Sequence, residues 1–103
     1  MEERRRNPRK SVHLRVDFVD GRGYVAMGLA RDISLGGMFV EQTAGLSSGE
    51  TITATFTLPT GQPFKTRAEV VRVNTAGFGM KFVDLYDRYS PDYLQSLETY
   101  CIA

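Results

Sequence analysis

The segment RDISLGGMFV, residues 31–40, combines side chains that can recognise a small polar ligand. Asp32 and Ser34 are two residues apart, so an extended backbone places both on the same outer face. There a carboxylate and a hydroxyl can bind the polar edge of a ligand, or they can simply be solvated. Gly36 and Gly37 follow, and glycine permits positive φ and close approach to the backbone. Taken alone, this short pattern is too common to predict a function.

A second group of side chains with binding chemistry lies at the start of the chain. Arg5 and Arg9 are four residues apart, and Pro8 between them prevents a regular helix. Each guanidinium can make two parallel hydrogen bonds to a phosphate or to the O6/N7 edge of guanine, and it can stack on a base. Arg6 and Lys10 repeat the spacing one residue later, but only Arg5 and Arg9 supply two guanidinium groups. This pair therefore predicts a clamp for a charged, planar ligand.

The basic side chains are concentrated near the start of the chain. The first ten residues carry five basic and two acidic side chains, a net charge of +3, whereas the whole 103-residue chain carries +1. The other 93 residues therefore have a net charge of −2. A basic head on a slightly acidic body favours an anionic partner that meets the head, although a charged terminus can also serve solubility alone.

Alternation of apolar and polar residues predicts strands along most of the chain. The expected strands span residues 12–18, 24–33, 38–41, 51–58, 64–73 and 78–82. Gly28 predicts a bulge or bend in the second strand. The adjacent Val70 and Val71 predict a bulge, or burial on both faces, in the fifth.

The hydrophobic period changes near the end of the chain. Ser90 and Pro91 are typical of a helix start, and five apolar or aromatic residues then share one helical face. These are Tyr93, Leu94, Leu97, Tyr100 and Cys101. Six short strands and one helix predict an all-β protein, a six-stranded antiparallel barrel with a C-terminal helix over an open end or a face of the sheet. We expect residues 1–11 to form a flexible arginine loop and residues 12–103 a single barrel domain, with its helix from about residue 90.

The composition argues against several other classes of protein. His13 is the single histidine and Cys101 the single cysteine, which leaves almost nothing for metal-dependent or triad chemistry and excludes an internal disulfide. The acidic residues form no obvious pair for acid–base catalysis, so we do not expect an enzyme. There is no signal-peptide pattern and no apolar run near 18 residues. We therefore expect a cytoplasmic protein without membrane insertion, in which Cys101 packs as a small apolar residue.

The two motifs together resemble those of the PilZ domain family. R-x-x-x-R at Arg5 and Arg9 is followed about two strands later by D-x-S-x-x-G at Asp32, Ser34 and Gly37. The segment GFGMKF at residues 77–82 also resembles the last barrel strand of that family. The resemblance covers nearly the whole chain, from about residue 3 to the final helix.

Membership of this family implies a fold and a ligand. PilZ domains are six-stranded antiparallel barrels that bind the bacterial second messenger cyclic di-GMP. The resemblance implies that Arg5 and Arg9 grip phosphates and guanine edges, and that Asp32 accepts hydrogen bonds from guanine N1–H and N2–H₂. It also implies that Ser34 bonds the ligand from the same face, and that Gly37, with Gly36 beside it, lets the ligand lie against the backbone.

Arg4 bears on how many ligand molecules bind. In the family, an arginine immediately before the arginine motif tends to accompany two intercalated molecules of cyclic di-GMP, and another residue there tends to accompany one. Arg4 therefore favours two. The expected mechanism is ordering of residues 1–10 against the barrel by the ligand, which creates a surface that an effector protein reads.

Two other functions compete with this interpretation. A nucleic-acid-binding barrel would use the arginine-rich head, but the barrel body is not basic and shows no obvious surface stripe of aromatic residues. A PilZ-like adaptor that works without nucleotide would show departures in one of the two motifs, and neither motif departs. The downstream partner and pathway, whether motility, polysaccharide export or transcription, do not follow from the sequence.

Overall fold

The alternating segments form six strands in the computed structural model, which describes residues 9–41, 45–83 and 92–102. The strands are β1 (Lys10–Val19), β2 (Val25–Ile33), β3 (Gly37–Glu41), β4 (Thr51–Thr57), β5 (Pro63–Asn74) and β6 (Gly77–Phe82). One helix, α1 (Asp92–Ile102), follows them. β1 starts two residues before the predicted position, because Lys10 and Ser11 already pair with Ile33 and Asp32 of β2.

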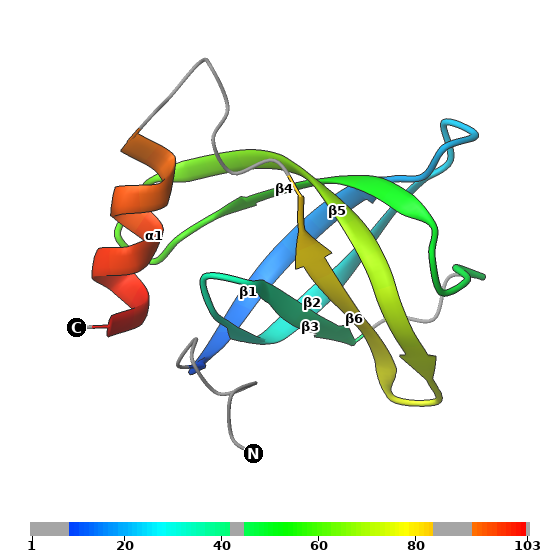
Figure 1. Ribbon diagram of the computed structural model, residues 1–103, viewed down its shortest axis with the longest axis horizontal. Coiled ribbons are helices and arrows are strands. Elements are labelled where there is room, and N and C mark those ends of the chain that lie inside the picture. Colours follow the sequence, from blue (N-terminus) through cyan, green and yellow to red (C-terminus); the bar gives the residue numbers. More distant parts are fainter. Residues whose placement is uncertain (1–8, 42–44, 84–91, 103) are drawn as a thin grey trace.

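The six strands close into an antiparallel barrel (Figure 1). Their order around the barrel is β1-β2-β3-β6-β5-β4, and β1 closes the ring by pairing with β4 over Asp17–Val19. Closure gives every strand two neighbours, which removes the exposed edges that promote aggregation. The predicted six-stranded antiparallel barrel with a C-terminal helix is confirmed.

The barrel interior is filled mainly by apolar side chains at alternate positions of the strands. The predicted inward residues of the first, fourth and sixth strands are all buried: Val12, Leu14, Val16, Phe18, Ile52, Ala54, Phe56, Leu58, Phe78, Met80 and Phe82. Phe18 meets Phe78 edge to face at 5.3 Å between ring centroids, so the core joins strands from opposite sides of the ring. This packing makes the barrel a rigid support for residues on its outer surface.

Bulges occur at two places that bear on the predictions. The register between β5 and β6 shifts between Val70 and Arg72, which confirms the bulge predicted at Val70–Val71. The bulge predicted at Gly28 is wrong, since Gly28 pairs regularly with Val16. The irregularity of β2 lies instead between Ala30 and Asp32, where Arg31 is the extra residue opposite β3.

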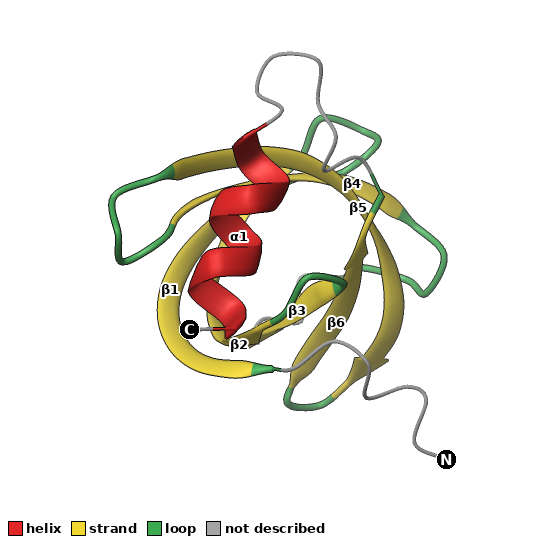
Figure 2. Cartoon of the chain, turned by 60° about the vertical axis from the view of Figure 1, so that its left-hand side comes forward, coloured by secondary structure: helices red, strands yellow, loops and turns green. Residues whose placement is uncertain are grey.

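Helix α1 lies across one open end of the barrel (Figure 2). Leu97 and Cys101 are buried, and burial raises the pKa of the Cys101 thiol, which fits the predicted role of a small packing residue. Lys10 donates a hydrogen bond of 3.1 Å to the carbonyl of Tyr100, and its ammonium lies 4.4 Å from the centroid of the Tyr100 ring. The start of β1 is therefore tied to the last turn of the helix.

Other parts of the predicted helix start cannot be compared with the structure. Ser90 and Pro91 lie outside the described residues, as do the side chains of Tyr93 and Leu94. Within the described residues, no helix is both long and apolar enough to cross a membrane.

The turn from β1 to β2 is organised by one buried carboxylate. Asp20 accepts backbone N–H bonds from Arg22 and Tyr24 at 2.9 Å each, and the Arg22 guanidinium bonds its second oxygen at 2.8 Å. The hydrogen bond from the Arg22 side chain, with those from the backbone, holds the pKa of Asp20 below its usual value. Gly23 completes the turn with a positive φ of 86°.

We expect the Asp20→Asn variant to lose stability at pH 7 and to lose less at acid pH. The folded-state pKa of Asp20 lies below the unfolded value of about 4, so its ionised form stabilises the fold above that pH, and the effect disappears as pH falls through the folded-state pKa. Urea unfolding of both proteins at pH 7 and at pH 3 measures this. An equal difference in unfolding free energy at the two pH values would contradict it.

Candidate functional site

The pairing of β1 with β2 brings the two predicted motifs together. Ser11 lies opposite Asp32, so Arg9, which immediately precedes β1, emerges beside the Asp32 carboxylate. Arg9 Nε donates to Asp32 Oδ1 at 3.0 Å, and Arg9 Nη2 donates to the same oxygen at 2.6 Å. Residues that are 23 positions apart in the sequence thus form one charged unit on the barrel surface.

The bulge at Arg31 decides that Asp32 faces outward. Ala30 and Ile33 are both buried, so two consecutive residues, Arg31 and Asp32, lie outside the core between them. With strict alternation from Ala30, position 32 would point into the barrel. A bulge of this kind redirects a side chain without ending the strand. Arg31 is held on the outer surface by an ion pair with Glu41 of β3.

The Arg9–Asp32 pair is only partly shielded from solvent. The side chains are 46 % and 33 % exposed, respectively. Ion pairs with this exposure contribute about 0–1 kcal/mol to stability, because water and salt screen them. A carboxylate has about four lone-pair positions, and Arg9 uses two of them, both on Oδ1. The pair can therefore be shared or opened by a ligand at little cost to the fold.

Ser34 does not lie with Asp32 on the outer face, and that prediction is wrong. β2 ends at Ile33, and Ser34 is only 1 % exposed in the turn that follows. Its backbone N–H donates to the Gly37 carbonyl at 2.8 Å, and its hydroxyl accepts the Gly36 N–H at 3.1 Å. The hydroxyl therefore shapes the β2–β3 turn.

Gly36 and Gly37 do not use the positive φ that glycine permits, but a close approach to the backbone is present at Gly37. A Cβ atom on Gly37 would lie 1.9 Å from the carbonyl oxygen of Met80. Gly37 pairs with Lys81 at the point where β3 meets β6, and the Gly36 carbonyl accepts the Phe82 N–H at 2.8 Å. The glycines let the turn sit tightly against β6.

Two of the predicted binding residues cannot be placed. Arg4 and Arg5 lie outside the described residues, so Arg9 is the member of the arginine motif whose contacts are seen. Lys10, the alternative to Arg9 in the shifted register, is engaged with Tyr100 of the helix. This contact supports Arg9 as the second arginine of the motif.

Phe39 is a neighbour of Asp32 that the sequence analysis did not single out. It lies opposite Asp32 in the β2–β3 pairing, on the outer side of β3, and it is half-buried, whereas Met38 and Val40 fill the core. An outward aromatic ring beside a carboxylate offers a surface on which a planar ligand can stack. The alternation within residues 38–41 already contained this signal.

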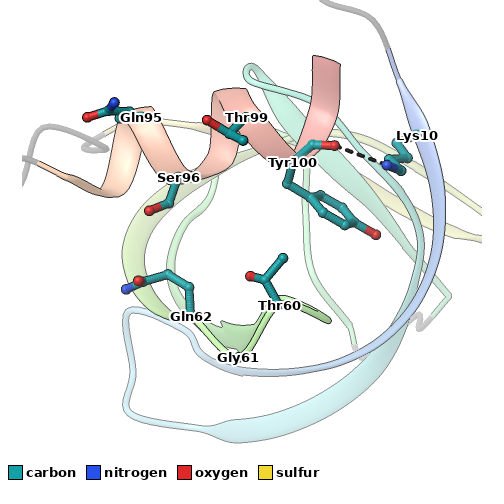
Figure 3. Close-up of a pocket in the computed structure, with 8 residues that line it drawn as sticks. All are labelled: Lys10, Thr60, Gly61, Gln62, Gln95, Ser96, Thr99 and Tyr100. Atoms are coloured by element: carbon teal, nitrogen blue, oxygen red, sulfur yellow. Dashed lines mark hydrogen bonds between the residues drawn. The ribbon is translucent and has the colours of Figure 1, made fainter. Parts of the chain in front are cut away.

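A groove with a volume of about 850 Å³ lies between α1 and the β4–β5 turn (Figure 3). Its lining is mainly neutral and polar: Lys10, Thr60, Gly61, Gln62, Gln95, Ser96, Thr99 and Tyr100. Figure 3 shows Gln62 and Thr60 on the side opposite the helix residues, with Lys10 at one end. Neither Arg9 nor Asp32 lines this groove. Lys10, the residue after Arg9, does line it.

The chain thus combines a closed antiparallel barrel, a helix across one open end and an arginine–aspartate ion pair on the outer surface, and these features define a class of small barrel domains. The sequence model of one such family, the PilZ domain, matches residues 3–103. The chain therefore belongs to the PilZ domain family, as the motifs predicted.

Solved structures of similar fold include three PilZ-containing proteins. The chain is 25 % identical to Bacillus subtilis MotI, also called DgrA, an inhibitor of motility, with a TM-score of 0.80 over 97 % of this chain. It covers 50 % of that protein, so it spans half the length of this relative. No curated protein sequence gives a match.

The other two similarities concern the fold alone. The PilZ domain of Escherichia coli YcgR, solved with c-di-GMP, is 16 % identical with a TM-score of 0.73, and 97 % of this chain covers 90 % of that one. The PilZ domain of CeSA from a cellulose-synthesizing bacterium is 18 % identical with a TM-score of 0.71, and 92 % of this chain covers 98 % of that one.

We expect Gly37→Ala to destabilise the protein strongly, because the added methyl group would overlap a backbone carbonyl of β6. Overpacking costs about 1–3 kcal/mol where side chains can move, and a backbone contact should put this variant at or above the top of that range. Thermal unfolding should then show a fall in melting temperature of about 10 °C or more. Gly21→Ala is the control, since a Cβ there meets nothing within 4 Å. Equal melting temperatures for the two variants would contradict the packing role.

Proposed function

We propose that this chain is a bacterial receptor for cyclic di-GMP that passes the signal to a partner protein. The observation that carries the proposal is the contact between Arg9 and Asp32, at 2.6 Å, which unites the two motifs at one point on the barrel. The proposed protein is a binding domain rather than an enzyme, needs no cofactor, and acts in the cytoplasm.

Arg9 and Asp32 supply complementary chemistry for a guanine nucleotide. The Asp32 carboxylate accepts the N1–H and N2–H₂ of a guanine, which require two acceptor positions side by side. The Arg9 guanidinium binds a phosphate or the O6/N7 edge, or stacks on the base. Phe39, beside Asp32, offers an additional stacking surface. Desolvation of the pair by the ligand strengthens these charge-assisted bonds.

The remaining predicted residues have two kinds of role in this proposal. Arg4 and Arg5 reach the ligand from the segment that precedes β1. Together with Arg9 they supply three guanidinium groups that can pair with phosphates of two intercalated ligand molecules. Ser34, Gly36 and Gly37 act through the shape of the β2–β3 turn, which holds Asp32 at the end of its strand.

The proposed signal is a change in what Arg9 and its neighbours contact. Without ligand, Arg9 is bonded to Asp32; with ligand, both bind the nucleotide and the preceding segment is drawn onto the barrel. Lys10 transmits this change to α1 through Tyr100. The proposed output is contact with another protein. The relative MotI is described as an inhibitor of motility.

We expect cyclic di-GMP to bind the purified chain saturably in isothermal titration calorimetry. Arg9→Ala and Asp32→Asn should each weaken binding about ten- to a hundredfold, because each removes charge-assisted hydrogen bonds of roughly 1.5–3 kcal/mol. Arg15→Ala and Asp17→Asn are matched controls, since these residues form a similar exposed ion pair of 3.1 Å elsewhere on β1. The controls should bind like the unaltered chain.

Two results would contradict this expectation. Unchanged affinity in both site variants would remove Arg9 and Asp32 from the site. No binding by the unaltered chain, checked by thermal shift, would favour an adaptor that works without nucleotide, and a steeply salt-dependent affinity for an oligonucleotide would favour the nucleic-acid-binding barrel.

The number of ligand molecules is a separate prediction. We expect two molecules of cyclic di-GMP per chain, and one after Arg4→Ala, because loss of this guanidinium leaves the second molecule without its phosphate partner. Calorimetric stoichiometry at saturating ligand measures this, with Arg6→Ala as the neighbouring control. A ratio of one in the unaltered chain would overturn the role assigned to Arg4.

A further inference from the structure

An apolar stripe runs along the outer surface of β1 and β2, away from the candidate ligand site. Eight large apolar side chains are exposed among the described residues. Five of them lie on or near the turn from β1 to β2 and on the first half of β2. Four form the stripe itself, with exposed fractions of 37 %, 68 %, 51 % and 37 %: Val19, Val25, Met27 and Leu29. Tyr24, 67 % exposed, lies next to it. Contiguous apolar surface of this kind usually marks an interaction site.

The charges beside the stripe are arranged with opposite signs on its two sides. Arg15 of β1 lies opposite Leu29, and Leu29 in turn lies opposite Glu41 of β3. One row across the three strands therefore reads positive, apolar, negative. Arg15 pairs with Asp17 of the same strand at 3.1 Å, and Glu41 pairs with Arg31, which lies on β2 in line with the stripe. These four charges sum to zero, and the row of Arg15, Leu29 and Glu41 is the part of the surface that is polarised across the stripe.

We propose that this face binds a second copy of the same chain through a two-fold axis that runs along β2. Rotation about that axis places the β1 side of one copy over the β3 side of the other. Arg15 of each copy then faces Glu41 of its partner copy, twice in the dimer, while the two stripes meet between them. Sheets that pack face to face lie about 10 Å apart, a gap that arginine and glutamate side chains span together.

The charges also select this axis over the other way of stacking the two faces. A two-fold axis across β2 at Met27 would place the β1 strands over each other. Because Asp17 lies opposite Met27, each Asp17 would then face its own copy at the centre of the interface. Like charges in that position are unfavourable. The axis along the strand avoids this contact, but it places Arg31, which lies on β2 itself, over Arg31 of the second copy. Each axis therefore has one like-charge contact, and the two contacts between Arg15 and Glu41 of the second copy favour the axis along the strand.

The occupant is a second copy because the surface is complementary to itself. A strongly charged partner would find no net charge to match, whereas an identical surface supplies both the apolar area and the opposite sign on each side. The stripe is smaller than a standard stable interface, so a weak dimer that depends on protein concentration follows. This proposal does not depend on cyclic di-GMP, because the row of Arg15, Leu29 and Glu41 excludes the proposed ligand residues.

Sedimentation equilibrium on the full chain, without ligand and over a series of concentrations, tests the proposal. The unaltered chain should show a monomer–dimer equilibrium. In a dimer of the Arg15→Glu variant, residues 15 and 41 are both glutamate, so like charges face each other at both contacts. In a dimer of the Glu41→Arg variant, both positions are arginine. Each variant should therefore dimerise at least about tenfold more weakly than the unaltered chain. In a mixture, Glu meets Arg at both contacts, and a one-to-one heterodimer should form with affinity close to that of the unaltered chain. High salt should weaken this recovery.

A matched pair of valine variants tests the apolar stripe. Val25→Glu should abolish measurable dimer, while Val73→Glu, at an exposed valine on β5 outside the stripe, should leave the dimer unchanged. Circular dichroism establishes that each variant is folded. A monomer at all concentrations, equal loss in both valine variants, or no recovery in the mixture would each overturn the proposal.

Discussion

The antiparallel register of β1 and β2 is the constraint on which the candidate site depends. Ser11 lies opposite Asp32. Arg9, the residue before the strand, is therefore placed beside the Asp32 carboxylate. The bulge at Arg31 completes the arrangement, since it turns Asp32 outward while Ile33 returns to the core. A register that slipped by one residue would exchange these two faces, and the buried apolar set forbids that slip.

The rest of the barrel holds this corner in place. Phe18 and Phe78 pack across the ring, and Gly37 lets β3 approach the carbonyl of Met80 on β6. On the other side, Lys10 connects the first residue of β1 to the last turn of α1. Two neighbouring residues at the start of β1 are therefore attached to two different elements, Arg9 to Asp32 of β2 and Lys10 to Tyr100 of α1. A ligand that moved Arg9 would therefore affect its contact with β2 and, through the neighbouring Lys10, the contact with α1. A change at one ion pair would in this way reach a larger part of the protein surface.

The strength of the central contact suits such a switch. A partly exposed ion pair contributes little to folding, so the protein can open it without losing stability. The same pair becomes stronger when a ligand excludes water around it. The interior, by contrast, is closely packed and apolar, so a rearrangement there would cost much more free energy than opening the ion pair. In the proposed function, stability and ligand binding therefore depend on different residues of the same strands: the inward residues stabilise the fold, and the outward residues bind the ligand.

The sequence by itself determined the strands, the inward residues and the pairing of an arginine motif with an aspartate motif, because alternation and residue type are local properties. It also predicted the bulge at Val70–Val71, where two adjacent valines break the alternation. Tertiary structure alone decided the bulge at Arg31, the burial of Ser34 and the position of Gly37 against Met80. Each of these depends on which strand lies alongside and in what register. The polarised row of Arg15, Leu29 and Glu41 has the same origin, since three strands must pair before the charges stand on opposite sides of one stripe.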